Sequence, residues 1–217
     1  RKEVQDHCAK IFAPVGEAAR KHDVKISFHP GQFCVLASVT PDIVERSILE
    51  FEYHVDLARW MGYGKTWHDG CKINVHISGK LGPEGLLKVF PRLSKEAQNL
   101  ITIENDEMSH GLEQSLVLEK HLALVLDIHH HWIRDEEYID AKDDRVKRVI
   151  DSWRGVRPTL HYSYSRDEHL AVAELGDKTH TEMHDIKMLL ERGCKKQKLR
   201  AHSDLLPNTK VNDWALS

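Results

Sequence analysis

The sequence lacks the features that mark several large classes of protein. No apolar stretch among its 217 residues approaches the roughly 20 residues that a membrane-spanning helix needs. Its 4 cysteines lie far apart with no CxxC pair, which argues against a disulfide scaffold and against a cysteine zinc site. No secretory signal opens the chain, and no glycine-rich GxGxxG or GxxxxGK(S/T) loop occurs in it. We therefore expect a protein of the reducing cytoplasm with no membrane partner.

An excess of positive charge is also missing, because 31 lysines and arginines face 34 aspartates and glutamates and the net charge is −3. No global positive field attracts nucleic acid or anionic lipid, so a polyanionic partner has to be bound locally. Histidine is the residue in excess, with 16 residues against 12 glycines. The 41% of hydrophobic residues is enough for one domain over residues 1–217, which leaves the histidine content as the feature that needs an explanation.

Short apolar runs alternate with amphipathic segments along the chain. Strands are predicted at 24–29, 72–77, 100–104, 122–127, 157–162 and 196–202, and helices at 40–61, 83–90, 94–98, 111–121, 140–153 and 180–192. Thr40 and Pro41 suit the N-cap and first position of their helix. The spacing of apolar residues before residue 13 indicates that the chain begins within a helix.

This alternation predicts an α/β fold with a parallel sheet and right-handed crossovers. Six strands in 217 residues predict a (β/α)8 TIM barrel that lacks its first one or two N-terminal βα units, as a single domain over 1–217. The alternative is a six-stranded open sheet with helices on both faces.

Each predicted strand ends in a residue that can bind a metal ion. These residues are His29, His76, Glu104, Asp127 (followed by His130), His161 and His202. A parallel barrel gathers the carboxyl ends of its strands around one mouth, so ligands that are distant in sequence converge there. The pattern therefore predicts a metal cluster, on the condition that the sheet curls into a barrel.

Three segments give this prediction its detail. Asp127 is followed by three histidines at a strand-to-loop junction, and Asp127 and His130 are the expected ligands of that group. Glu104 ends a buried strand, where a carboxylate pairs with a base or binds a cation, and it could bridge two ions. His180 and His184 lie one helical turn apart, with His180 the better candidate.

Imidazole and carboxylate ligands without thiolate favour manganese, iron or zinc over calcium or magnesium. Two or three such ions could activate water and stabilise the attacking and leaving oxygens of an in-line displacement.

Residues that could touch a nucleic acid form weaker signals. Gln32 and Phe33 follow the turn after His29 and could offer an amide and an aromatic ring to a base, although Phe33 could equally be buried in its loop. The basic clusters at 142–148 and 195–200 could contact phosphates or could be solvated helical faces.

Five motifs in this order resemble the UV damage endonuclease family: HPGQF at 29–33, NVHI at 74–77, IEND at 103–106, DIHHH at 127–131 and HYSYSR at 161–166. The resemblance implies a (β/α)8 barrel with a centre of two or three divalent ions, manganese first and zinc or iron as alternatives. It also implies a monomeric DNA repair enzyme that nicks damaged double-stranded DNA immediately 5′ to UV photoproducts and some other lesions. The products would carry a 3′-hydroxyl and a 5′-phosphate.

Residue roles follow from the same resemblance. The implied metal ligands are His29, His76, Glu104, Asp127, His130, His161 and His180. We expect Glu104, His76 and His161 to be the catalytic residues. Gln32 and Phe33 correspond to a lesion-probing pair in which the family has tyrosine instead of Phe33.

Two positions depart from the family's pattern. The family commonly has lysine where Thr159 stands here, and a glutamate ligand in the region of His202, Ser203 and Asp204. We expect His202 to replace that glutamate as the ligand.

Two other functions fit part of the pattern. A xylose-isomerase-like sugar isomerase or epimerase is also a metal-bearing barrel, but it needs only one or two ions and a sugar-sized pocket. A protein that buffers metal or binds a partner would carry the histidines without catalysis.

Overall fold

Five parallel strands form one sheet in the order β1-β2-β3-β4-β5, so that β3 lies in the middle and β1 and β5 are the edges. The computed structural model describes residues 2–135, 137 and 139–162, and all structural statements concern these residues. The strands are β1 Ile26–Phe28, β2 Cys71–His76, β3 Ile101–Glu104, β4 Ala123–Asp127 and β5 Leu160–His161. These five strands were predicted, and the sixth, at 196–202, lies outside the described residues.

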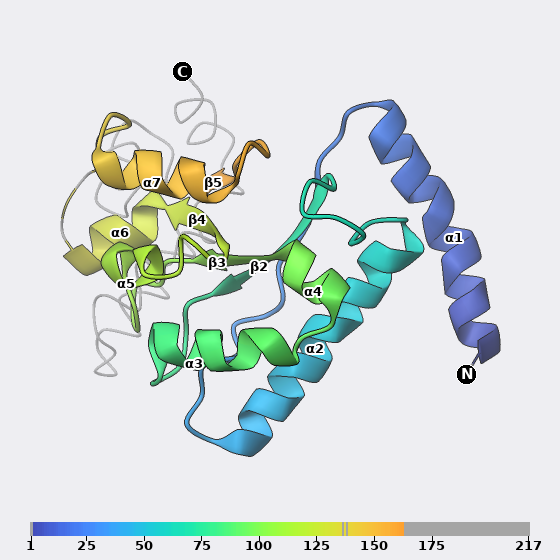
Figure 1. Cartoon of the computed structure of the whole chain (residues 1–217), viewed down its shortest axis with the longest axis horizontal. Helices are drawn as coiled ribbons and strands as arrows, with labels where there is room; N and C mark the ends of the chain where they lie inside the picture. Colours follow the sequence, from blue (N-terminus) through green and yellow to red (C-terminus); the bar gives the residue numbers. More distant parts are fainter. Residues whose placement is uncertain (1, 136, 138, 163–217) are drawn as a thin grey trace, which may run out of the picture.

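Helices connect the strands in the expected alternation (Figure 1). They are α1 Lys2–Lys21, α2 Pro41–Trp60, α3 Gly82–Val89, α4 Lys95–Leu100, α5 Leu112–Leu116, α6 Ile128–Asp135 and α7 Asp144–Ser152, with a short 3-10 turn, η1, at Phe90–Arg92. None of the helices in the described ranges is both long enough and apolar enough to cross a membrane.

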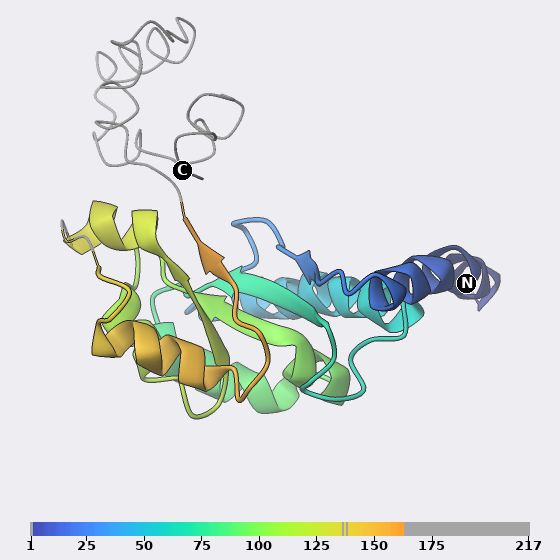
Figure 2. The same cartoon turned by 90° about the horizontal axis from the view of Figure 1, so that it is seen from above.

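The two faces of the sheet have different chemistry because side chains alternate along a strand. One face carries the main core, where Ile73, Val75 and Ile103 pack against apolar side chains of the surrounding helices. The other face carries Lys72 and Asn74 on β2 and, on the neighbouring strands, the polar residues Thr102, Glu104 and Asp127, all buried. Helices therefore cover the apolar face. The polar residues lie on the opposite face, on the inside of the curl, and Figure 2 shows the curl of the sheet and the helices beside it.

The curl of the sheet brings its two edge strands close to each other. At the carboxyl end, the rings of His29, which follows β1, and His161, on β5, lie 6.2 Å apart. At the amino end, Lys25 Nζ donates to Thr159 Oγ1 at 3.1 Å and to the main-chain oxygen of Arg157. The described sheet is thus a parallel half-barrel, which favours the barrel prediction over an open sheet with helices on both faces.

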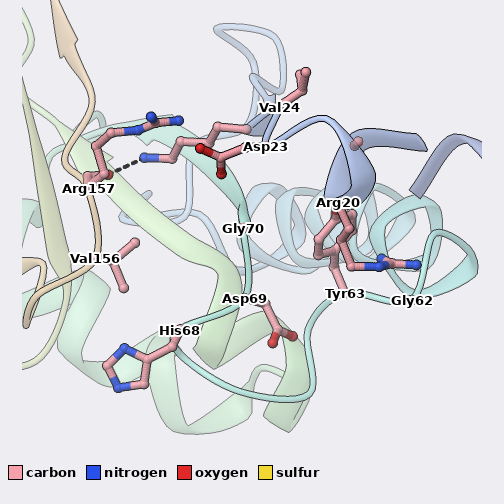
Figure 3. Close-up of a pocket in the computed structure, with 12 residues that line it drawn as sticks. Arg20, Asp23, Val24, Gly62, Tyr63, His68, Asp69, Gly70, Val156 and Arg157 are labelled. Atoms are coloured by element: carbon pink, nitrogen blue, oxygen red, sulfur yellow. Dashed lines mark hydrogen bonds between the residues drawn. The ribbon is translucent and has the colours of Figure 1, made fainter. Parts of the chain in front are cut away.

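A cavity of about 620 Å³ opens beside this amino-terminal contact (Figure 3). It is lined by residues that precede β1, β2 and β5, among them Lys25, Gly70 and Arg157. Burial lowers the pKa of Lys25 to about 8, and the Arg157 guanidinium acts in the same direction. The cavity lies at the end of the sheet away from the residues that were predicted to bind metal.

One local expectation was wrong. The segment with three histidines begins helix α6 instead of a loop, because Asp127 Oδ1 accepts a hydrogen bond from the His130 main-chain N–H at 2.8 Å and so caps the helix. Thr40 and Pro41 take the predicted positions, the N-cap and the first turn of α2, although the Thr40 side chain makes no capping hydrogen bond.

Replacing Lys25 tests the contact between the sheet edges. Lys25→Met keeps an apolar stem against the Trp153 ring, 4.2 Å from Nζ in the native chain, but removes the donors to Thr159 and Arg157. We expect the free energy of unfolding to fall by about 1–2 kcal/mol, measured by urea denaturation at pH 7. Lys147→Met, at an exposed lysine of α7, is the matched control. Equal stability of the two variants would show that the contact does not hold the edges together.

Candidate metal centre

The predicted ligands meet at the carboxyl ends of the strands. His76, Glu104, Asp127 and His161 are the last residues of β2, β3, β4 and β5, and His29 directly follows β1. The strand register pairs His76 with Glu104 and Asp127 with His161. Residues from five separate segments therefore lie side by side, as the sequence pattern predicted.

Glu104 is the centre of this group. Its side chain is 1% exposed; Oε2 lies 3.1 Å from His29 Nε2 and Oε1 lies 2.9 Å from His161 Nδ1. Asn74 Nδ2 also donates to Oε2, and Thr102 Oγ1 donates to Asn74 Oδ1 at 3.0 Å. Burial alone would raise the pKa of Glu104, but the hydrogen bonds from His161 and His29 hold it well below its ordinary value.

One group of donor atoms lies on the Oε2 side of Glu104. His29 Nε2 is 3.1 Å from Oε2, His76 Nε2 is 3.7 Å from it, and the two nitrogens are 3.2 Å apart. Ligands that share an ion at about 2.1 Å lie roughly 3.0–3.4 Å from each other in octahedral and tetrahedral geometry. The three residues therefore fit one divalent ion with little rearrangement.

The two histidines of this group are oriented through their other ring nitrogens. His29 Nδ1 lies 3.0 Å from the Pro30 carbonyl oxygen, and His76 Nδ1 lies 3.2 Å from Asp106 Oδ2. When Nδ1–H donates to an oxygen, the neutral ring presents its lone pair at Nε2, and metal-binding histidines are usually oriented by such a hydrogen bond. Burial alone would lower the pKa of His76, but the hydrogen bond to Asp106 and the Glu104 charge raise it.

A second group lies on the Oε1 side of Glu104. His161 Nδ1 is 2.9 Å from Glu104 Oε1 and 3.7 Å from Asp127 Oδ2. Asp127 Oδ2 is buried and makes no hydrogen bond within the described ranges. A buried carboxylate oxygen without a hydrogen bond costs several kcal/mol unless a cation satisfies it, so this group also fits a metal ion. Glu104 can serve both groups at once.

Three supporting residues were not predicted from the sequence. The Asn105 side chain donates to the Asp127 carbonyl oxygen at 2.9 Å and accepts from the Asp127 N–H at 2.7 Å, which fixes the end of β4. Asp106 Oδ1 accepts from the N–H groups of Met108 and Ser109, at 2.7 Å each.

The hydrogen bonds that Asp106 accepts from Met108, Ser109 and His76 outweigh burial and lower its pKa to about 2.

Glu107 is the third supporting residue. Its Oε2 atom lies 3.3 Å from His130 Nε2. The signal that could have revealed these residues is the unbroken polar run Glu104–Glu107 after a buried strand.

Gln32 and Phe33 occupy the tip of a turn in the loop that follows His29. The Cys34 N–H donates to the Gly31 carbonyl oxygen at 2.9 Å and closes the turn. Phe33 is 79% exposed, so the alternative that it is buried in its loop is wrong. An exposed aromatic ring therefore stands four residues from His29, a predicted metal ligand.

The structure describes only some of the remaining residues that the sequence analysis singled out. His180, His202, Ser203, Asp204 and the basic cluster at 195–200 lie outside the described residues. Thr159 stands where the family commonly has lysine, and its Oγ1 atom accepts a hydrogen bond from Lys25 Nζ. In the basic cluster at 142–148, carboxylates pair with Arg145, Lys147 and Arg148, which favours a solvated face over a phosphate contact.

A curled parallel sheet with histidine and carboxylate groups at its carboxyl edge defines a half-barrel whose donor atoms fit divalent metal ions. The sequence model of the UV-endonuclease UvdE family matches residues 2–215, and the chain belongs to this family.

Several characterised relatives are similar to the chain. The UV DNA damage endonuclease of Bacillus pumilus is 30% identical over 168 residues, which cover 73% of this chain and 51% of that protein. The UV-damage endonuclease of Neurospora crassa is 27% identical over 71% of this chain and 26% of its own length. The crystal structure of SacUVDE superposes with a TM-score of 0.62 at 27% identity, over 74% of this chain and 55% of that one. The chain spans about half the length of the Bacillus pumilus and Bacillus velezensis relatives that it matches.

Substitution of Glu104 tests the centre. Glu104→Gln preserves the shape of the side chain but removes the negative charge that both ligand groups share. We expect the affinity for Mn²⁺ to fall at least about tenfold, measured by calorimetric titration and by metal analysis after gel filtration. Glu84→Gln, on the exposed first turn of α3, is the control and should bind as the wild type does. Unchanged binding by Glu104→Gln would contradict the assignment.

Proposed function

We propose that this chain carries the metal centre and the lesion-facing loop of a DNA repair endonuclease. The enzyme hydrolyses the phosphodiester bond immediately 5′ to UV photoproducts and some other lesions, and leaves a 3′-hydroxyl and a 5′-phosphate. The observation that carries the proposal is the buried carboxylate of Glu104 between two histidine-containing ligand groups, in a chain of the UvdE family. The damaged strand is the substrate, and the protein acts on double-stranded DNA as a monomer with the complete eight-stranded barrel of its family.

The residues at the strand ends would hold two or three divalent ions, with manganese first and zinc or iron as alternatives. Such ions activate a water molecule and stabilise the charge that develops on the phosphate oxygens. His29 and His76 would hold an ion on one side of Glu104, and Asp127 and His161 on the other, with His130 at the start of α6 as a further ligand. His180 and His202 complete the proposed ligand set.

The chain's own contribution to the reaction is orientation and charge. Glu104, His76 and His161 form the catalytic core of the proposal, because Glu104 accepts from both sides while Asp106 fixes the His76 ring. Burial alone would lower the pKa of His161, but the hydrogen bond to Glu104 and the charges of Glu104 and Asp127 raise it. A cation bound at this group would compete with that proton for the ring nitrogen.

Lesion recognition is assigned to Gln32 and Phe33. An exposed aromatic ring can stack on a base, and stacking contributes about 1–3 kcal/mol per base. A damaged base leaves the helical stack at a lower cost than an intact one, which gives the pair a basis for selectivity. Phe33 keeps the stacking surface of the family's tyrosine but not its hydroxyl, which leaves hydrogen bonding to the Gln32 amide.

Family membership favours this function over a sugar isomerase. We also propose a cytoplasmic location. It rests on the spacing of the cysteines, and in the described part of the chain Cys8, Cys34 and Cys71 are free thiols.

The proposal predicts nicking of a UV-irradiated duplex in the presence of Mn²⁺, with no cleavage of the same duplex before irradiation. Phe33→Ala should lower kcat/KM about 5- to 150-fold, the equivalent of 1–3 kcal/mol of stacking, whereas Phe33→Tyr should retain activity. Gel mapping of end-labelled strands measures both the rate and the position of the cut.

Leu49→Ala is the control for loss of an exposed apolar side chain, because Leu49 is 71% exposed on α2. Its activity should equal that of the wild type. If the wild type leaves irradiated DNA uncut, the proposed function is wrong.

A further inference from the structure

Three neighbouring loops at the carboxyl end of the sheet each expose a side chain that the metal centre does not use. The loops follow adjacent strands and comprise residues 29–40 after β1, 77–81 after β2 and 105–111 after β3. Their exposed residues are Phe33, Lys80 and Met108. An aromatic ring, a cation and an unbranched apolar side chain therefore stand on three consecutive loops.

Hydrogen bonds join these three loops to one another. The Leu81 N–H donates to the Ala37 carbonyl oxygen at 3.0 Å, which connects the loop after β2 to the loop after β1. His110 Nε2 donates to the Gly79 carbonyl oxygen at 2.9 Å, which connects the loop after β3 to the loop after β2. The exposed side chains therefore belong to one continuous surface beside the centre.

Lys80 is held at the middle of this surface by the residue before it. Gly79 has a φ of +100°, and a Cβ atom there would lie 2.5 Å from the Ala37 carbonyl group, so only glycine allows the two loops to pack this closely. Lys80 is exposed and takes part in none of the ion pairs between described residues. Its ammonium group is therefore available to a phosphate.

Met108 combines a fixed main chain with an exposed side chain. Its N–H donates to Asp106 Oδ1 at 2.7 Å, and Oδ2 of the same carboxylate lies 3.2 Å from His76 Nδ1. The Met108 side chain is nevertheless 48% exposed. Proteins that bind distorted DNA insert apolar side chains, methionine among them, between base steps. The flexible thioether of methionine fills irregular gaps of this kind.

We infer that Lys80 and Met108 extend the Phe33 position into one surface for a short stretch of DNA whose bases have left the helical stack. Lys80 binds a backbone phosphate, and Met108 fills the gap beside an unstacked base. Cations along the backbone combined with side chains that contact bases are the usual means of binding unpaired strands. A chain with a net charge of −3 needs such a local cation. The inference rests on the proposed function in that the DNA is a damaged strand.

Binding to a DNA that cannot be cut tests the role of Met108. The probe is a duplex with one photoproduct, a non-hydrolysable phosphonate bond on its 5′ side and 2-aminopurine beside the lesion, studied with Mn²⁺ present. Met108→Ala should bind this duplex about 3- to 10-fold more weakly, measured by fluorescence anisotropy. The rise in 2-aminopurine fluorescence that reports unstacking should be smaller as well.

Two further variants separate apolar contact from other effects. Met108→Leu keeps an apolar side chain and should restore most of the affinity. Val117→Ala is the matched control, because Val117 is 62% exposed in the loop before β4, at the opposite end of the sheet. It should bind the duplex as the wild type does.

The salt dependence of binding tests Lys80. Lys80→Gln should lower the affinity for the same duplex and reduce the slope of log K against log salt concentration by about 1, the value of one phosphate contact. Lys65→Gln, at an exposed lysine between α2 and β2, is the control and should keep the wild-type slope.

The affinity for Mn²⁺ should be unchanged in Met108→Ala and Lys80→Gln, because neither side chain belongs to the metal centre. Wild-type DNA affinity and salt dependence in either variant would overturn the inference. If the wild type leaves irradiated DNA uncut but both variants bind the phosphonate duplex more weakly, the proposed function fails and this surface stands.

Discussion

The buried carboxylate of Glu104 is the constraint on which the rest of the centre depends. A charged carboxylate that is 1% exposed costs several kcal/mol unless donors surround it. Glu104 meets this requirement because it ends the middle strand of the sheet, where side chains from both neighbouring strands and both edges can reach it. Asn74, His29 and His161 donate to it from three directions. The position of these residues follows from the need to compensate one charge.

The need to surround the Glu104 carboxylate with hydrogen-bond donors also explains why the sheet curls. His29 follows one edge strand and His161 ends the other, and a flat sheet of five strands spaced about 4.8 Å apart would hold them almost 20 Å from each other. Both reach Glu104 only because the sheet bends toward its polar face. Lys25 makes the corresponding contact at the amino end, where it joins the segments before β1 and β5. Two polar contacts, one at each end of the strands, therefore define the half-barrel.

The sequence predicted those features that depend on local patterns along the chain, namely the strands and the polar residues at their ends. Apolar runs and their polar ends located five strands and placed His76, Glu104, Asp127 and His161 at one edge, because parallel strands share direction. Contacts across the fold could not be obtained in this way. The capping of α6 by Asp127 converts the expected loop into a helix, and the assignment of Asn105 to Asp127 depends on two strands lying side by side. The exposure of Phe33 depends on how its turn closes.

The four residues Glu104–Glu107 show how a short segment can organise a whole centre. Strand pairing ends at Glu104, so the three residues that follow no longer alternate between the two faces and each can turn toward the site. Asn105 fixes Asp127 and His130, Asp106 fixes His76 and the loop, and Glu107 faces His130. Hydrogen bonds to Asp106 and Glu104, and the charges of nearby carboxylates, outweigh burial and raise the pKa values of His76 and His161. Divalent ions would bind the same carboxylates, so the same set of side chains can organise the centre before and after metal binding.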